Sequence, residues 1–202
     1  TIDVEAIDID GDKDMDLVLA NRDKQQNYVY LNDGNLGFST KIPFGTGTDE
    51  TRSVAVADFN QDGTLDIVWA SGYLSDFSKD KIAWLPNDGN GNFGKENVVA
   101  ERLTENLYSL KTLDVDNDGD LDVLADYGNL ALYDNKGDKS FGTARWLTDD
   151  LEGEGEIILS DLDKNGFEDL ISKKNNNISW YPLTTNGFGD KQIISTDFSH
   201  LT

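Results

Sequence analysis

Four short loops of this chain carry Asp and Asn residues at the same spacing. The oxygen-bearing side chains stand at the first, third, fifth and ninth positions of each loop. They are Asp8, Asp10, Asp12 and Asp16 in the first loop, Asp58, Asn60, Asp62 and Asp66 in the second, Asp114, Asp116, Asp118 and Asp122 in the third, and Asp161, Asp163, Asn165 and Asp169 in the fourth. Ca²⁺ prefers hard oxygen ligands, about six to eight of them, in a flexible geometry. The pattern therefore predicts calcium binding, with up to four ions per chain.

The EF-hand is a competing interpretation of such loops, and the sequence argues against it. An EF-hand needs a bidentate Glu at position twelve and a helix on either side. Position twelve here holds Leu19, Trp69, Ala125 or Ser172. Ordinary acidic turns use the same residue types, but four loops in register, each with Asp at position nine, favour metal binding.

Short apolar runs flank each loop, and their length and β-branched residues predict strands. The runs before the loops are Val4 to Ile7, Val54 to Ala57, Leu110 to Leu113 and Ile157 to Leu159. The runs after the loops are Leu17 to Ala20, Ile67 to Ala70, Val123 to Ala125 and Leu170 to Ile171. A third strand follows in each repeat, and a weaker fourth strand comes after it, as in Asn97 to Ala100. Turns such as Asn87-Asp88-Gly89 between them are strong hairpin signals.

The repetition of this unit predicts the architecture. The first Asp residues of the four loops are 50, 56 and 47 residues apart. A period of this length with four strands per repeat is typical of a β-propeller blade. We therefore expect an all-β fold, a β-propeller of four-stranded antiparallel blades, in a single domain over residues 1–202. The repeats are expected at approximately 1–47, 48–103, 104–149 and 150–202.

The loops and their flanking runs resemble the FG-GAP/VCBS repeat family. The residues that carry the resemblance are the loop pattern Asp-x-Asp/Asn-x-Asp-Gly-x-x-Asp, the run Ser53 to Asn60 before it and the run Lys81 to Gly94 after it. That family forms β-propeller blades, including the calcium-binding blades of integrin α-subunit heads and of some fungal lectins. The resemblance covers essentially the whole chain. It implies either a four-bladed propeller or part of a larger ring of about seven blades.

The resemblance also implies a main-chain ligand at position seven of each loop. The carbonyl oxygens at this position belong to Asp14, Thr64, Asp120 and Phe167. Three loops depart from the family pattern. Lys13 replaces Gly at position six, and because a side chain is costly in left-handed backbone, this favours a distorted first site, although Gly11 lies close by. Asn60 and Asn165 each replace a carboxylate, which predicts weaker binding in the second and fourth loops.

The charge of the chain excludes some partners. Its 17 Lys and Arg against 39 Asp and Glu give a net charge of −22. Nucleic-acid binding is not expected, because phosphate contacts need a basic surface. Membrane insertion is not expected either, because no apolar run is long enough to span a bilayer. Four bound Ca²⁺ would bring the net charge to about −14, so we expect calcium to stabilise the fold.

Aromatic residues offer a second kind of candidate site. Those that recur once per repeat, such as Trp84 and Phe141, are expected to pack between blades. Aromatics that do not recur are better ligand candidates. Tyr73, Phe77 and Lys79 lie in a connection that is longer than its counterparts in the other repeats, and loops often carry function. We take these three as candidate ligand-binding residues, with a solvated insertion as the alternative.

The sequence offers little support for catalysis. His200 is the only histidine, the chain has no Cys, and no Gly-rich phosphate loop is present. We therefore expect a non-enzymatic calcium-binding module for a glycan or a protein surface, acting in binding or adhesion. The alternatives are a structural subunit that associates with further copies or neighbouring chains, and the propeller part of a polysaccharide-degrading enzyme. Weak calcium sites suit the millimolar calcium outside cells, so an extracellular or cell-surface location is expected.

Overall fold

All the regular structure that the computed structural model describes is β-strand. The described residues are 2–72, 80–101, 103, 106–147, 156–174 and 177–195. Their strands form four four-stranded antiparallel sheets and one short two-stranded hairpin. The predicted all-β fold of four-stranded blades is therefore confirmed. The described part of the chain has no helix that could cross a membrane.

Each sheet is a simple meander of consecutive strands, which we call blades one to four in chain order. Blade one contains β1 (Asp3–Ile7), β2 (Asp16–Ala20), β3 (Asn27–Leu31) and β4 (Thr40–Phe44). Blade two contains β5 (Thr51–Ala57), β6 (Asp66–Ser71), β7 (Lys81–Leu85) and β8 (Asn97–Glu101). Blade three contains β9 (Ser109–Leu113), β10 (Asp122–Asp126), β11 (Leu130–Tyr133) and β12 (Arg145–Trp146). Blade four contains β13 (Glu156–Ser160), β14 (Asp169–Lys174), β15 (Asn177–Tyr181) and β18 (Gln192–Ser195).

Blade four differs from the others by a small hairpin that the sequence did not predict. Its strands are β16 (Leu183–Thr184) and β17 (Gly187–Phe188), which pair with each other between β15 and β18. Strand β18 then pairs with β15, so the four-stranded order of the blade is kept.

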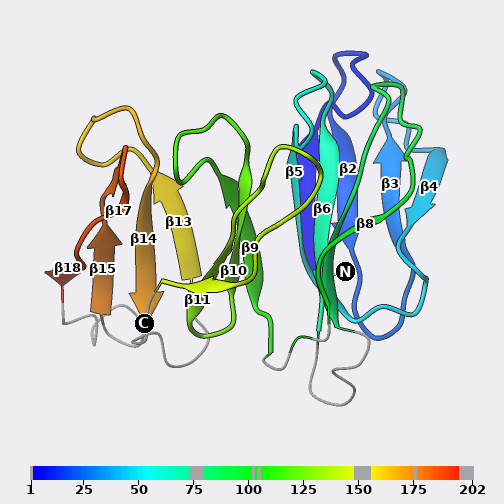
Figure 1. Cartoon of the computed structure of the whole chain (residues 1–202). Coiled ribbons are helices and arrows are strands. Elements are labelled where there is room, and N and C mark those ends of the chain that lie inside the picture. Colours follow the sequence, from blue (N-terminus) through cyan, green and yellow to red (C-terminus); the bar gives the residue numbers. More distant parts are fainter. Residues whose placement is uncertain are drawn as a thin grey trace.

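The four blades follow one another in sequence order across the molecule (Figure 1). The first strands of neighbouring blades lie together, with β1 against β5 and β5 against β9. The Asp3 carboxylate fixes two of these strands, since one oxygen accepts hydrogen bonds from the Ser53 hydroxyl at 2.8 Å and the Val54 N–H at 3.0 Å. The Ser53 hydroxyl in turn accepts the Leu110 N–H of blade three at 3.2 Å. No described strand of blade four pairs with blade one, so the sheets do not close on themselves.

The core lies between the blades. One apolar cluster joins blades one and two, a second joins blades two and three, and a third joins blades three and four. Burial along the strands follows from this layering. In the end blade, β2 alternates between buried and half-buried residues, whereas β6 and β10 are buried along their whole length because a blade covers each face. Phe141 packs against Phe59 of the neighbouring blade, and Trp84 is buried, as expected for the recurring aromatics.

Candidate metal centres

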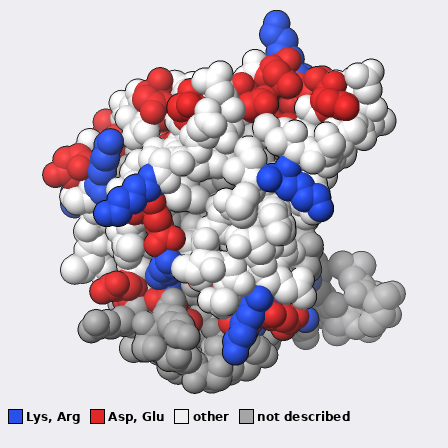
Figure 2. All heavy atoms as spheres, turned by 90° about the vertical axis from the view of Figure 1, so that its right-hand side faces the viewer, with Lys and Arg blue, Asp and Glu red and all other residues white. Residues whose placement is uncertain are grey.

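The four Asp-rich loops occupy equivalent places in the fold. Each connects the first strand of a blade to the second, so all four lie at the same end of the molecule. Figure 1 shows these connections at the upper end of the sheets, and Figure 2 shows acidic side chains gathered along that upper end. The fold therefore repeats one loop geometry four times.

Position one folds each loop back on itself. The carboxylate of Asp58 accepts the Gly63 N–H at 2.9 Å and the Asp62 N–H at 3.2 Å. The equivalent bonds to position six are made in the other loops, to Asp8, Asp114 and Asp161, at 3.0 to 3.1 Å. Short polar side chains readily accept such bonds from nearby backbone, which is why Asp suits this position.

Two positions in every loop adopt left-handed backbone. They are positions four and six: Gly11 and Lys13, Gln61 and Gly63, Asn117 and Gly119, and Lys164 and Gly166. Loop one therefore has its glycine and its non-glycine residue exchanged. Lys13, with φ 79°, still donates its N–H to Asp8 as the glycines do to their own Asp. The expected distortion of the first loop is not observed in this backbone pattern, although the Lys side chain carries the strain of a left-handed residue.

Position nine anchors the loop to the blade. Its Asp is 0–1 % exposed in all four loops, and both carboxylate oxygens accept backbone N–H groups. In loop three, Asp122 accepts from Val115 at 3.0 Å and from Asn135 at 2.8 Å. Equivalent pairs of bonds are made by Asp16, Asp66 and Asp169. One bond reaches the start of the loop and the other reaches a residue one or two positions past the third strand, so this carboxylate holds two segments together.

Burial changes the protonation of two of these anchors. Desolvation raises the pKa of Asp66 to about 6, from an ordinary value of 3.8, and does the same for Asp122. The accepted N–H bonds lower both pKa values, but the neighbouring loop carboxylates raise them again. The pKa of Asp10 is also raised. Burial is the main cause, the hydrogen bond from the Asp12 N–H opposes it, and the neighbouring carboxylates add to it. Crowded carboxylates in low dielectric disfavour the charged form, and a bound cation would relieve this.

The structure brings positions one, three and nine together. Three triads have a carboxylate oxygen from each residue within 4.8 Å of the others: Asp8, Asp10 and Asp16; Asp114, Asp116 and Asp122; and Asp161, Asp163 and Asp169. In loop two, Asn60 supplies an amide oxygen in place of the third carboxylate. An all-oxygen donor set with converging negative charge fits a hard cation such as Ca²⁺.

Position five stands outside these triads and has a backbone role. One side-chain oxygen of Asp12, Asp118 and Asn165 accepts the N–H of position seven at 2.8 to 2.9 Å. Asp62 accepts the same bond from Thr64, at 2.9 Å, and the Thr64 hydroxyl also donates to it. These bonds fix the turn that carries the predicted main-chain ligands, the carbonyls of Asp14, Thr64, Asp120 and Phe167.

Sequence reasoning missed the asparagines that open the turn after the third strand. Asn87 donates its amide to the Leu65 carbonyl at 3.0 Å and to the Ile9 carbonyl of blade one at 2.7 Å. Asn135 repeats this, donating to Leu121 at 3.2 Å and to Phe59 of blade two at 3.3 Å. Each amide thus ties its own metal loop to the loop of the preceding blade. The signal in the sequence is the recurrence of Asn two residues before Gly, a pattern that by itself indicates only a turn.

The other predicted residues cannot be placed in the same way. Tyr73, Phe77 and Lys79, the candidate ligand-binding residues, lie outside the described part of the chain.

Comparison with known families agrees with the loop and blade pattern. A model of the FG-GAP-like repeat matches residues 8–69 and 114–172, and a model of the FG-GAP repeat matches residues 51–92. The matched segments include all four metal loops and the strand that follows each of them. A search of curated proteins found no match.

Two solved structures are similar to this chain in fold. A lectin from Agrocybe aegerita, which recognises non-reducing terminal N-acetylglucosamine, is 19% identical with a TM-score of 0.67, covering 96% of this chain and 52% of the lectin. The Tc holotoxin pore of Photorhabdus luminescens is 17% identical with a TM-score of 0.50, covering 99% of this chain and 10% of the toxin. The chain thus spans about half the length of the lectin and a tenth of the toxin, and at these identities the likeness is one of fold. The repeat models match more than half of the residues, and the chain belongs to the FG-GAP-like repeat family.

Proposed function

We propose that this protein is a calcium-stabilised binding module that recognises a glycan through its propeller fold. The proposed calcium binding is supported by one observation: the same carboxylate triad recurs at the same place in three blades. Uncompensated carboxylates this close repel one another, and the cost is borne three times in a fold whose net charge is already −22. A bound cation at each loop removes that cost.

The ion would act in structure rather than in chemistry. Positions one, three, five and nine would hold it, together with the main-chain oxygen of position seven. The chain's own residues already link each loop to the segment after the third strand through position nine. Asn87 and Asn135 also link the first three loops to a neighbouring blade. A cation that neutralises the carboxylates of a loop therefore also stiffens the contact between blades. A ligand surface would be built at that contact.

A glycan is the ligand class that the comparisons favour. The Agrocybe aegerita lectin shares the fold across nearly the whole of this chain and recognises terminal N-acetylglucosamine. We propose an extracellular or cell-surface setting, where millimolar calcium occupies half or more of the sites with Kd of about 10⁻⁴ to 10⁻³ M. We also propose that the module is not an enzyme, since its clustered carboxylates serve the metal loops.

A glycan array run in millimolar calcium, and again with chelator, tests this function. Selective glycan binding that is lost with chelator is the expected result. Absence of glycan binding by a folded, calcium-loaded sample would refute the glycan-binding role. A circular dichroism spectrum of each sample serves as the folding control.

A second candidate function, as an assembly subunit, rests on a separate observation. The sheets do not close, and blade four exposes apolar side chains: Ile158, Leu162, Ile193 and Ile194 are 46–60 % exposed. Unpartnered apolar surface of this kind is typical of interfaces. Light scattering over a range of concentrations distinguishes self-association from a stable monomer.

A further inference from the structure

The strongest unassigned feature is a cavity between blades two and three. It has a volume of about 410 Å³, within the range of about 300 to 1,000 Å³ that is typical of small-ligand sites. Its walls come from β8, from the residue after β10, from the end of β11 and from the segment that leads into β12. None of its lining residues belongs to a metal loop.

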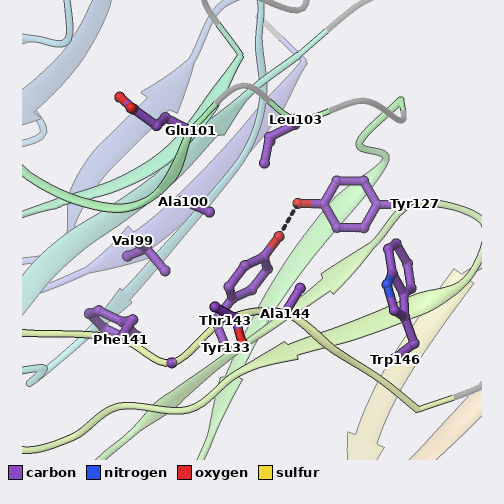
Figure 3. Close-up of a pocket in the computed structure, with 11 residues that line it drawn as sticks. Val99, Ala100, Glu101, Leu103, Tyr127, Tyr133, Phe141, Thr143, Ala144 and Trp146 are labelled. Atoms are coloured by element: carbon purple, nitrogen blue, oxygen red, sulfur yellow. Dashed lines mark hydrogen bonds between the residues drawn. The ribbon is translucent and has the colours of Figure 1, made fainter.

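Aromatic rings dominate one side of this cavity. The rings of Tyr127 and Trp146 meet edge to face with centroids 5.7 Å apart, and Trp146 is 50 % exposed. The hydroxyls of Tyr127 and Tyr133 lie 2.9 Å apart and form a hydrogen bond. Figure 3 shows these two hydroxyls pointing toward each other, with the indole of Trp146 beside the Tyr127 ring. One O–H of the pair donates in this bond, and both tyrosines line the cavity as buried residues, 9 % and 6 % exposed.

Two of the three rings are special to this blade. The residues five positions after the position-nine Asp in the other repeats are Asn21, Ser71 and Lys174, whereas blade three has Tyr127. By strand register, Trp146 corresponds to Pro43 in blade one, Val98 in blade two and Ile193 in blade four. Residues that only complete blade packing recur from repeat to repeat, as Phe93 and Phe141 do. A half-exposed Trp beside a tyrosine pair, present in one blade only, is therefore not explained by packing.

The polar groups of the cavity limit its occupant. Glu101 is the only charged residue among the described lining residues, and Figure 3 shows its carboxylate turned away from the tyrosine pair. A negative ligand is disfavoured by this carboxylate and by the net charge of −22. A half-exposed Trp face with the neutral hydroxyls of two buried tyrosines nearby suits a molecule that has one apolar C–H face and an edge of hydroxyls. A neutral pyranose has both.

We propose that the cavity between blades two and three is a saccharide site that takes a terminal neutral pyranose, with Trp146 against the C–H face of the sugar. The hydroxyl pair of Tyr127 and Tyr133 bonds to a sugar hydroxyl. This assignment rests on the proposed glycan-binding function and places it at one blade interface.

The test uses the full calcium-loaded chain with methyl N-acetyl-β-glucosaminide and methyl β-galactoside as probes. Saturation-transfer NMR and tryptophan fluorescence give the affinities. Trp146→Val installs the residue of blade two at a half-exposed position, so folding is retained. Tyr127→Phe keeps the ring and removes one hydroxyl. Ile193→Val changes the equivalent position of blade four and is the matched control.

The proposal expects at least one glycoside to bind, Trp146→Val to weaken that binding about tenfold and Ile193→Val to leave it unchanged. Tyr127→Phe is expected to weaken glycoside binding. Because the ring is kept, the melting temperature should change less than it would if the whole ring were removed. Binding that Trp146→Val and Tyr127→Phe leave unaltered overturns this site while the glycan-binding function stands. Failure of both glycosides to bind also overturns it, and the glycan array then decides the function separately.

Discussion

At the scale of single residues, the same residue type performs two different tasks in each loop. Position nine, as in Asp122, is buried and has both oxygens engaged by backbone N–H groups. Position five, as in Asp118, is exposed and uses one oxygen to fix the turn. Loop four carries Asn at that position, so a neutral side chain is compatible with the loop fold there. Of the two, position nine is the one that anchors the loop to the blade without any metal.

Replacement of the position-nine Asp should therefore destabilise the protein even in chelator. Asp122→Ala leaves two buried N–H groups without acceptors, and we expect the free energy of unfolding to fall by about 2 kcal/mol. Asp118→Asn, which copies loop four, should leave stability in chelator unchanged and weaken only calcium binding. Urea denaturation with and without calcium measures both. Equal stability of Asp122→Ala and the unsubstituted chain in chelator would contradict the anchoring role.

The raised pKa of the anchors predicts the pH dependence of the metal-free form. Asp66 and Asp122 have a folded pKa of about 6 against an ordinary 3.8, so they bind protons more tightly when folded. Their contribution to stability is therefore fully present below about pH 4 and is lost as the pH rises through 6. Asp62 lies in the same loop as Asp66, but the Thr64 hydroxyl and N–H lower its pKa.

Carboxyl ¹³C NMR titration in chelator provides the measurement. The signals of Asp66 and Asp62 should titrate on opposite sides of the ordinary value, which gives an internal control within one loop. A midpoint for Asp66 at or below 4 would show that burial does not act as described. Added calcium should lower the midpoint of Asp66, because the ion competes with the proton.

At the scale of elements, the blades are joined by polar links as well as by apolar packing. The amides of Asn87 and Asn135 each reach a carbonyl of the preceding blade. Asn32, the equivalent residue of blade one, donates to Met15 within its own blade and to no other blade among the described residues. Blade four has Leu183 at this place, so a leucine is sterically acceptable there.

Asn135→Leu should consequently weaken the join between blades two and three. Two buried carbonyls lose their donor, and we expect a loss of about 1 to 3 kcal/mol in the free energy of unfolding. Asn32→Leu is the matched control and should cost less, since it removes no link between blades. Equal losses in the two variants would count against a role in joining blades.

At the scale of the whole molecule, stability depends on the net charge and on the unclosed arrangement of the sheets. The net charge is −22, much of it concentrated in loops at one end of an unclosed set of blades. Self-repulsion of this size opposes the compact state. Stability is therefore expected to depend on calcium more steeply than on any single contact.

Chelator should lower the melting temperature sharply. At ten times Kd, each site contributes about 1.4 kcal/mol, and four sites contribute about 5 to 6 kcal/mol. That is a large share of a domain's typical stability of about 5 to 15 kcal/mol. Differential scanning fluorimetry with calcium, magnesium and chelator makes the comparison. An unchanged melting temperature in chelator would contradict the structural role of calcium.

The sequence by itself determined the elements and the loops of this protein. Ligand spacing within nine residues and the apolar runs on either side are local patterns, and local patterns can be recognised in the sequence without the fold. They predicted the four-stranded blades, now confirmed, and the residues of each loop. They failed at Lys13, because the exchange of glycine between positions four and six preserves the same left-handed pair.

Only the tertiary structure decided how the blades meet. The bond from Asn87 to Ile9 joins residues 78 apart in sequence, and the cavity gathers Trp146 and Tyr127 against β8 of another blade. Such contacts depend on the angle and spacing of packed sheets, and no local pattern encodes these. The same holds for the burial that raises the pKa of Asp66, because desolvation is a property of everything packed around a group.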